Sequence, residues 1–224
     1  MFFSGLLDLL APPDCPACAL PYEPTGAELG LCPACAPLIE LPPAARQPPA
    51  AEAAICLYQG PMADAIRRFK YGDQRQLLRH FRPLLTAAAL RYAGSVDAVV
   101  PVPMHPRKLR QRGWSPAALL ARPIAAALGV PLQTRWLRRV RETAVQAGLT
   151  RDARAHNVRG AFRASPCPPA RILLVDDVRT TGATLLEAAG CLALAGHTVS
   201  SLTLAWALQE PPEPAAWALG RVAV

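Results

Sequence analysis

The chain has 224 residues, of which 52% are hydrophobic, with a mean hydropathy of +0.18 and a formal net charge of +8. That length suffices for one α/β domain and a small appendage, and the composition excludes a wholly disordered chain. No apolar run reaches the roughly 18–20 residues needed to cross a bilayer, and the opening MFFSGLLDLLAPP lacks the features of a signal peptide. We therefore expect a cytoplasmic protein with no membrane insertion.

Charge is unevenly distributed along the chain. Residues 1–55 contain one basic and six acidic residues, whereas residues 67–163 contain 20 basic and four acidic residues, a local net charge of +16. Two interpretations stay open for this basic segment: a solvated surface or the binding of a polyanionic ligand.

Four of the seven cysteines fall in two identical CPAC tetrapeptides, separated by 13 residues. Each tetrapeptide brings two thiolates to one side of a tight turn, and two such turns complete a tetrahedral shell for one structural Zn²⁺. A redox dithiol or a disulfide framework is the alternative, which a reducing compartment disfavours. We predict a zinc module over residues 1–40 with four ligands: Cys15, Cys18, Cys32 and Cys35.

A proline- and alanine-rich connector over 41–53 follows and marks the expected domain boundary, so that the second domain covers 54–224. Residues 54–60 read as an edge strand. Two helices are expected next, over 61–70 and 75–94, the second ended by Gly94.

The rest of the chain alternates strands and helices. DAVVPVP (97–103) predicts a buried strand that leads into the loop MHPRKLRQRGW, and Ser115-Pro116 predicts a helix start. A long basic segment precedes a strand over 172–175, a helix after Thr184 and a final strand over 197–208. This order is typical of a parallel sheet with helices on both faces.

The segment ILLVDDVRTTGATL (172–185) is where chemistry is expected. Asp176 and Asp177 stand where an apolar strand would leave the sheet, and a turn rich in hydroxyls follows at once. A Walker-B strand would need a P-loop, which the chain lacks, and a receiver domain would need about a hundred further residues. The predicted turn residues are Thr180, Thr181, Gly182, Ala183 and Thr184.

Residues 172–184 closely resemble the signature of type I phosphoribosyltransferases for 5-phosphoribosyl 1-pyrophosphate (PRPP). The physical chemistry agrees with that ligand. The helix N-terminus and the backbone amides of the turn suit the 5-phosphate, and Gly182 lets the backbone approach it. The two carboxylates suit the ribose hydroxyls and can help to hold Mg²⁺ with PRPP.

The resemblance extends to the ComF family over nearly the whole chain. It implies a type I phosphoribosyltransferase fold, with a mostly parallel sheet and helices on both faces, and a small N-terminal zinc ribbon with four cysteine ligands. It also implies a cytoplasmic protein linked to natural competence and the use of imported DNA. The matching features are the twin CPAC, FKYGD (69–73), VPVPMHPRKLRQRGW (100–114), the spread Arg141, Thr143, Gln146, Leu149, Arg154, Asn157, then Gly160-Ala161-Phe162 and the PRPP motif.

Basic residues are assigned to the pyrophosphate of PRPP. Arg107, Lys108, Arg110 and Arg112 follow the strand over 97–103, at the carboxyl end where open α/β sheets bind ligands. Residues 141–162 look like the lid of amidophosphoribosyltransferases, which implies that Arg141, Arg154 and Asn157 close over the pyrophosphate. One departure concerns the family's R-G-F-N-Q, which here reads Arg112-Gly113-Trp114-Ser115-Pro116 and puts a substrate-reading role there in doubt.

The function expected from these features is that of a PRPP- and Mg-binding phosphoribosyltransferase-like protein in nucleotide or DNA-uptake metabolism, with an unknown acceptor. The competence machinery is an expected partner. The alternative is a single-stranded-DNA-binding competence protein in which PRPP is a regulator or a vestigial ligand. In that alternative Arg67, Arg68 and Lys70 contact DNA, with four aromatic residues as stacking platforms: Phe69, Tyr71, Trp114 and Trp136.

Overall fold

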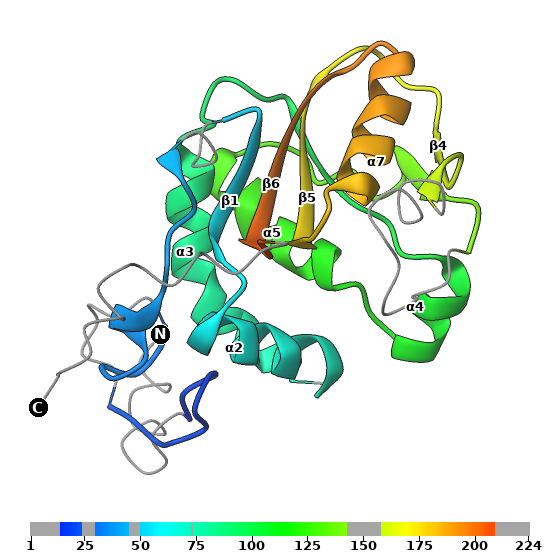
Figure 1. Ribbon diagram of the computed structural model, residues 1–224. Helices are drawn as coiled ribbons and strands as arrows, with labels where there is room; N and C mark the ends of the chain where they lie inside the picture. The colour runs from blue at the N-terminus through cyan, green and yellow to red at the C-terminus, as the bar shows by residue number, and fades with distance from the viewer. Residues whose placement is uncertain (1–13, 24–29, 45–49, 73, 143–157, 209–224) are drawn as a thin grey trace, which may run out of the picture.

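The computed structural model describes residues 14–23, 30–44, 50–72, 74–142 and 158–208 (Figure 1). Their elements, in chain order, are η1 (Ala36–Leu38), β1 (Glu52–Leu57), α2 (Gly60–Tyr71), η3 (Arg75–Leu77), α3 (Leu78–Leu90), β2 (Ala98–Pro101), α4 (Pro106–Arg112), α5 (Pro116–Leu128), β3 (Leu137–Arg139), β4 (Phe162–Ala164), β5 (Arg171–Arg179), α7 (Ala183–Leu194) and β6 (Thr198–Trp206).

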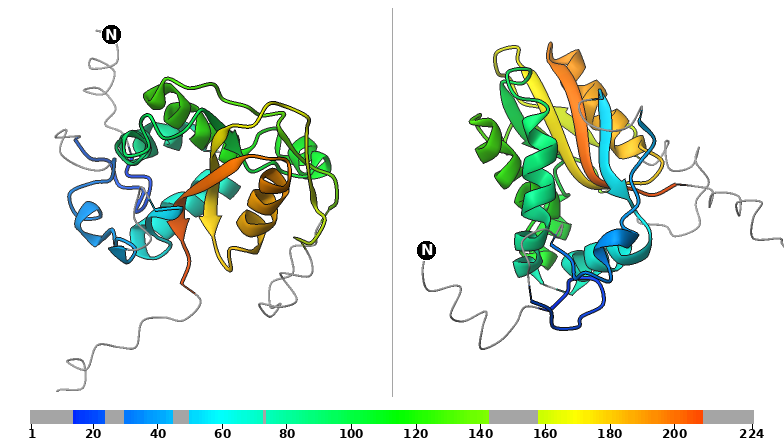
Figure 2. Two further views of the ribbon diagram at one scale, coloured as in Figure 1. Left: turned by 90° about the horizontal axis from the view of Figure 1, so that it is seen from above. Right: turned by 90° about the vertical axis from the view of Figure 1, so that its left-hand side faces the viewer.

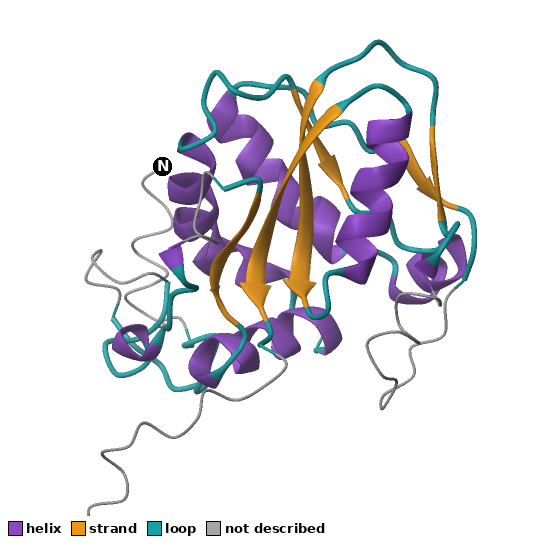
Figure 3. Cartoon of the chain, turned by 45° about the horizontal axis from the view of Figure 1, so that its top comes forward, coloured by secondary structure: helices purple, strands orange, loops and turns teal. Residues whose placement is uncertain are grey.

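Four strands form one parallel sheet in the order β1-β6-β5-β2. Their arrowheads point toward the same edge (Figure 3). The apolar run of β5 is buried on both faces, because successive side chains of a strand point to opposite sides. Leu173 and Val175 therefore join one core cluster, whereas Ile172 and Leu174 join another.

Helices cover both faces of the sheet, as the sequence predicts. The first core cluster includes Phe81 of α3 and Ile124 of α5, and the second includes Leu185 and Leu192 of α7. Seen from the side, α3 and α5 lie on one side of the strands and α7 on the other (Figure 2). Within the described residues, no helix combines the length and the apolar character that crossing a bilayer requires.

Several boundaries differ from the sequence-based expectation. The loop after β2 contains the helix α4, because Pro106 starts it and Gly113, in the left-handed conformation, ends it. The segment before β5 contains a small antiparallel sheet of β3 and β4, which its basic composition did not indicate. The strand β1 begins at Glu52, and α3 ends at Leu90, before Gly94.

The cysteine module packs against the start of α3 and against α2. Gly30 has a φ of +78°, and a Cβ there would lie 2.1 Å from the backbone oxygen of His80, so only glycine permits this approach. The Tyr22 hydroxyl lies 3.5 Å from Nδ1 of His80, which is buried. From α2, Arg68 donates hydrogen bonds to the carbonyl oxygens of Cys15 and Pro16, at 3.1 and 3.2 Å.

Candidate functional site: an acidic edge of the sheet

The two acids lie inside β5 and not after it. Strand β5 continues to Arg179, so the expectation that the strand ends at Val175 is wrong. The reason is that β6 still pairs with these residues, Asp176 opposite Thr203 and Val178 opposite Ala205. The side chains of both acids remain half-buried at the carboxyl end of the sheet. We call this region, Asp176 and Asp177 with the turn 180–184, the acidic edge.

The side chain of Lys70 completes the acidic edge. Helix α2 runs below the arrowheads of β5 and β6 (Figure 1), and its Lys70 Nζ lies 2.9 Å from Oδ1 of Asp177. Both side chains are largely shielded from solvent, at 18% and 14% exposure. Asp177 Oδ1 also accepts a hydrogen bond from the amide of Val178 at 2.6 Å, and Asp176 Oδ1 accepts one from the amide of Asp177 at 2.8 Å.

The two carboxyl groups stand in different surroundings, since Asp177 pairs with Lys70 and Asp176 is the more perturbed acid. Burial, together with the adjacent charge of Asp177, raises the pKa of Asp176 to about 7. Burial alone would lower the pKa of Lys70, but the carboxylate of Asp177 reverses that effect and raises it. The ion pair with Lys70 holds the Asp177 side chain in place, while the pKa of Asp176 lies near neutrality.

The turn after the acids has the geometry expected of an anion-binding helix start. Gly182 adopts φ +80° and is the N-cap of α7, and the Thr181 hydroxyl accepts a hydrogen bond from the amide of Ala183 at 3.3 Å. Arg179 lies beside this turn, since a Cβ on Gly182 would stand 3.0 Å from its Nε. The guanidinium of Arg179 also stacks over Trp206 and pairs with Glu52 at 3.0 Å.

The predicted pyrophosphate residues 107–112 all lie on α4, which follows the end of β2. Pro101, the last residue of β2, pairs with Val175, next to the acids, so the loop bearing α4 starts at the same edge of the sheet. Arg107 Nη1 lies 3.5 Å from Glu142. Arg110 is exposed, and Lys108, whose pKa burial lowers, is half-buried.

Two motifs that are distant in sequence meet through aromatic side chains. The guanidinium of Arg112 lies 5.3 Å from the ring centroid of Tyr71 and 5.9 Å from that of Trp114. The Phe69 ring packs edge-on against Trp114, with centroids 5.1 Å apart. Residues 69–72 of FKYGD and the RGW motif therefore form one structural unit next to the acidic edge, with Trp114 buried in the core.

The expected lid is described only in part. Arg141 donates a hydrogen bond to the backbone oxygen of Arg159, which joins the chain on either side of residues 143–157. Arg154 and Asn157, together with Thr143, Gln146 and Leu149, lie outside the described residues. The closure of a lid over pyrophosphate stays a prediction.

Two basic residues near the acids were missed as site residues by the sequence-based reasoning. Lys70 was considered only as a DNA contact, although its place in FKYGD was a signal that could have found it. Arg139 on β3 is half-buried, with its guanidinium carbon 5.3 Å from the ring centroid of Phe162. Burial lowers the pKa of Arg139, and the negative charge of Asp176 opposes that shift. Nothing in the basic run around Arg139 distinguished it from its neighbours.

The four cysteines of the twin CPAC come together as predicted. Their sulfur atoms all lie within 4.8 Å of one another, and Cys18 Sγ lies 3.8 Å from Cys32 Sγ. A tetrahedral shell with Zn–S bonds of about 2.3 Å places sulfur atoms about 3.8 Å apart, whereas a disulfide needs about 2.05 Å. The cluster therefore has the spacing of a metal site with four thiolate ligands, and its cysteines are not disulfide-bonded.

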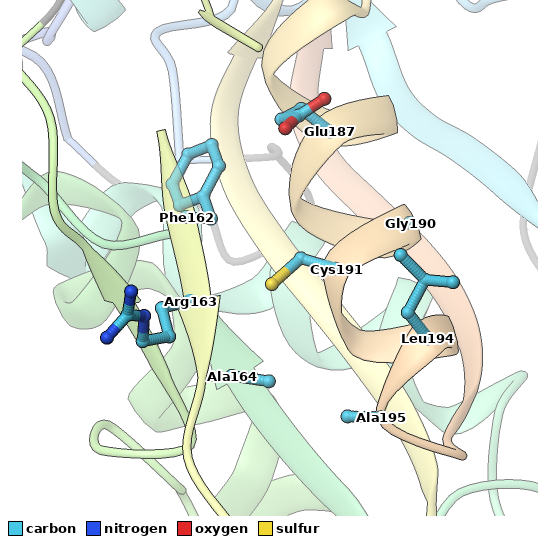
Figure 4. Close-up of a pocket in the computed structure, with 8 residues that line it drawn as sticks. All are labelled: Phe162, Arg163, Ala164, Glu187, Gly190, Cys191, Leu194 and Ala195. Carbon is cyan, nitrogen blue, oxygen red and sulfur yellow. The ribbon is translucent and has the colours of Figure 1, made fainter. Parts of the chain in front are cut away.

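A hollow of about 470 Å³ lies between β4 and α7 (Figure 4). It is open, its lining contains one acid, Glu187, and it is formed by β4 and by α7 from Glu187 onward, beyond the turn at Gly182. We assign it no role in the acidic edge. Its lining residues are Phe162, Arg163, Ala164, Glu187, Gly190, Cys191, Leu194 and Ala195.

The parallel sheet, the helices on both faces and the four-cysteine cluster confirm the α/β architecture and the small N-terminal four-cysteine module expected from the sequence. The chain is 30% identical over 184 residues to "DNA utilization protein YhgH" of Salmonella typhimurium, covering 80% of this chain and 77% of that protein. The chain belongs to the ComF family.

Two further relatives carry competence names. "Competence protein F" of Haemophilus influenzae is 34% identical over 140 residues, which is 58% of this chain and 61% of that protein. "Competence protein ComFC" of Bacillus subtilis is 26% identical over 154 residues, which is 66% of this chain and 60% of that protein. No model of a protein family matches the chain.

Solved structures with some likeness include a phosphoribosyltransferase and a PRPP amidotransferase. Orotate phosphoribosyltransferase from Aeropyrum pernix has a TM-score of 0.39 and 20% identity over 60% of this chain and 62% of that one. Glutamine PRPP amidotransferase from B. subtilis has a TM-score of 0.41 and 19% identity, over 62% of this chain and 30% of that one. Both TM-scores are too low to support a conclusion on their own.

Proposed function

We propose that this protein binds PRPP with Mg²⁺ at the acidic edge and acts as a phosphoribosyltransferase-like protein. The observation that carries the proposal is the sequence of groups at the end of β5: two half-buried carboxyl groups, then the Gly182 turn that opens α7. A phosphorylated sugar offers its hydroxyls to the two carboxyl groups and its phosphate to the Gly182 turn. The acceptor of a transferred ribosyl group stays open.

Each part of PRPP meets a matching group in this proposal. The 5-phosphate lies on the turn 180–184, where the amides at the start of α7 favour an anion. The ribose hydroxyls donate to Asp176 and Asp177. The pyrophosphate faces the basic residues of α4, Arg107, Lys108, Arg110 and Arg112, with Arg141 as the described part of the lid.

The same arrangement suits the chemistry of phosphoribosyl transfer. Transfer breaks the bond between C1 of the ribose and the pyrophosphate oxygen, and negative charge grows on the departing pyrophosphate. Preorganised guanidinium groups stabilise such charge best when they are fixed before the reaction. Arg112 meets that condition, because Tyr71 and Trp114 hold its guanidinium in place.

The residues present also fit the two metals expected from the sequence. Asp176 and Asp177 offer the oxygen ligands that Mg²⁺ prefers, and would hold it together with the phosphates of PRPP, where it neutralises their charge. The four thiolates of the cysteine module suit one structural Zn²⁺. By analogy with the names of its relatives, we place the activity in DNA utilisation or competence metabolism.

The structure gives less support to the alternative, single-stranded DNA binding. Arg68 and Lys70 are engaged with protein partners, and Phe69 and Trp114 are buried. Trp136 stacks on His197, with ring centroids 5.7 Å apart. Of the proposed DNA contacts, Arg67 and Tyr71 are exposed, and Arg67 pairs with Asp64 at 2.6 Å.

A comparison of ligands in a thermal melt tests the proposal. PRPP with Mg²⁺ should raise the melting temperature more than ribose 5-phosphate or pyrophosphate, because it alone reaches every part of the site. Pyrophosphate release should then be assayed with free bases as acceptors. An equal shift from pyrophosphate alone would contradict the assignment. A larger shift from single-stranded DNA, unaffected by PRPP, would favour the alternative.

A further inference from the structure

Helix α2 lies between the cysteine module and the acidic edge and contacts both near its C-terminal end. Arg68 Nη1 donates to the carbonyl oxygens of Cys15 and Pro16, and Lys70 Nζ pairs with Asp177. The two residues are two positions apart, and an α-helix turns by about 100° per residue, so their side chains leave the helix on nearly opposite sides. A displacement of this turn of α2 changes both contacts together.

The carbonyl oxygens that Arg68 contacts belong to the first CPAC itself. Cys15 is fully buried, and its amide and carbonyl are also bonded to Leu20 and Ala19, as the tight turn requires. The position of these oxygens therefore depends on the fold of the metal-binding turn. Arg68 therefore contacts the metal-binding turn directly, through charge-assisted hydrogen bonds, which are stronger than hydrogen bonds between neutral groups.

The Lys70 contact has a clear consequence for the acids. Asp177 Oδ1 accepts hydrogen bonds from Lys70 Nζ and from the amide of Val178, so the loss of Lys70 would leave a largely shielded carboxyl group without its side-chain partner. Lys70 therefore holds the Asp177 side chain in place. Phe69, between the two contacts, packs on Phe81 and Trp114 and keeps α2 attached to the core.

We propose that α2 couples the cysteine module to the acidic edge. Lys70 is a positioning residue for Asp177, and the hydrogen bonds from Arg68 to the first CPAC fix where Lys70 lies. Loss of the metal-binding fold shifts the end of α2 and loosens Lys70 from Asp177. Because Phe69 still holds the helix, the pair is weakened and not abolished. The effect of this coupling on PRPP binding rests on the proposed function, whereas the ion pair between Lys70 and Asp177 is testable without ligand.

The chain offers a direct assay, because Lys70 and Lys108 are its only lysines. Acetylation by N-hydroxysuccinimide acetate requires a free, accessible amine, so the ion pair protects Lys70. Mass spectrometry gives the rate at Lys70 relative to Lys108 in the intact, ligand-free protein. Asp177→Asn, which removes the partner of Lys70, should accelerate the reaction severalfold and sets the upper limit of the rate.

Arg68→Ala and the exposed-ligand variant Cys18→Ser should each accelerate Lys70 acetylation severalfold. The matched control is Arg67→Ala, on the same helix, whose guanidinium pairs with exposed Asp64; it should leave the rate unchanged. Circular dichroism shows whether each variant keeps its fold. Unchanged rates in Arg68→Ala and Cys18→Ser, equal rates in Arg67→Ala and Arg68→Ala, or no acceleration in Asp177→Asn would each overturn the proposal.

PRPP affinity adds a second, separable readout. Lys70→Met should weaken binding of PRPP with Mg²⁺, Lys70→Arg should restore part of it, and Arg68→Ala should weaken it less than Lys70→Met. If the wild-type protein does not bind PRPP, the proposed function fails, while the lysine assay still decides the coupling. If Lys70→Arg and Lys70→Met bind equally, Lys70 has no positioning role.

Discussion

Lys70 on α2 forms an ion pair with Asp177 on β5 at 2.9 Å, across 107 residues of sequence. This pair connects the FKYGD motif with the acidic motif and gives the two acids different roles. The Asp177 side chain is fixed by Lys70, whereas burial and the adjacent Asp177 raise the pKa of Asp176 to about 7. The site therefore holds less negative charge at neutral pH than its two aspartates suggest.

The raised pKa of Asp176 predicts a pH-dependent stability in the ligand-free protein. Its pKa in the folded state lies above the unfolded value near 4, so the native state holds the extra proton and loses stability as pH rises from about 4 to about 7. Asp176→Asn removes this loss. The difference in unfolding free energy, variant minus wild type, should therefore be larger at pH 8 than at pH 5 by on the order of 2 kcal/mol.

Urea unfolding at the two pH values measures this effect. The control is Asp97→Asn: hydrogen bonds and charge from Arg171 lower the pKa of Asp97 to about 2, so its effect should be the same at pH 5 and pH 8. Parallel pH profiles for Asp176→Asn and wild type would contradict the prediction.

Gly182 is predicted to be essential for phosphate binding. Its φ of +80° costs an alanine on the order of 1–2 kcal/mol, and a Cβ would press against Arg179. Gly182→Ala should abolish the PRPP-dependent rise in melting temperature. The matched control is Gly190→Ala in α7, where a Cβ meets no atom within 4 Å; it should keep the ligand response and gain up to about 1 kcal/mol of stability. Retained binding in Gly182→Ala would refute the role of the turn.

Arg112 is predicted to contact the pyrophosphate and not the sugar phosphate. Arg112→Ala should weaken PRPP binding about tenfold, the loss expected for one charge-assisted hydrogen bond. Affinity for ribose 5-phosphate should stay near wild type. Arg138→Ala, an exposed arginine on β3, serves as the control for net charge. Calorimetry with both ligands checks this, and equal losses for the two would place Arg112 elsewhere.

The cysteine module should hold one zinc ion per chain. Elemental analysis of purified protein should give close to one equivalent, and Cys15→Ser should lose it and unfold the module while the sheet domain survives. Structural zinc contributes about 10–16 kcal/mol in small modules, so a partial effect is not expected. Cys191→Ser, outside the cluster, should retain the metal. Metal-free protein with an intact module would exclude the assignment.

Much of the fold and part of the site follow from sequence alone. The twin CPAC, the apolar run of β5 and the Ser115-Pro116 start of α5 each have one simple structural meaning, and the structure agrees with them. Local chemistry decides these features, because a cap, a ligand spacing or a buried strand is set by a few adjacent residues.

Contacts between distant segments could not be predicted in this way. Nothing local indicates that Lys70 pairs with Asp177, or that Arg68 serves the cysteine module, because both depend on how α2 crosses the end of the sheet. The same holds for the extension of β5 through its acids, which depends on β6. Motif resemblance drew attention to FKYGD and to the acidic motif, but it gave no indication that Lys70 contacts Asp177.

The most direct test of the central claim is calorimetric titration of PRPP with Mg²⁺ into three proteins: wild type, Asp176→Asn/Asp177→Asn and Gly190→Ala. Wild type and Gly190→Ala should bind one PRPP per chain with equal affinity. The double variant should bind PRPP much more weakly but keep its weak affinity for inorganic phosphate, because the turn is intact. No saturable PRPP binding to wild type, or equal binding to all three, would contradict an acidic edge built for PRPP.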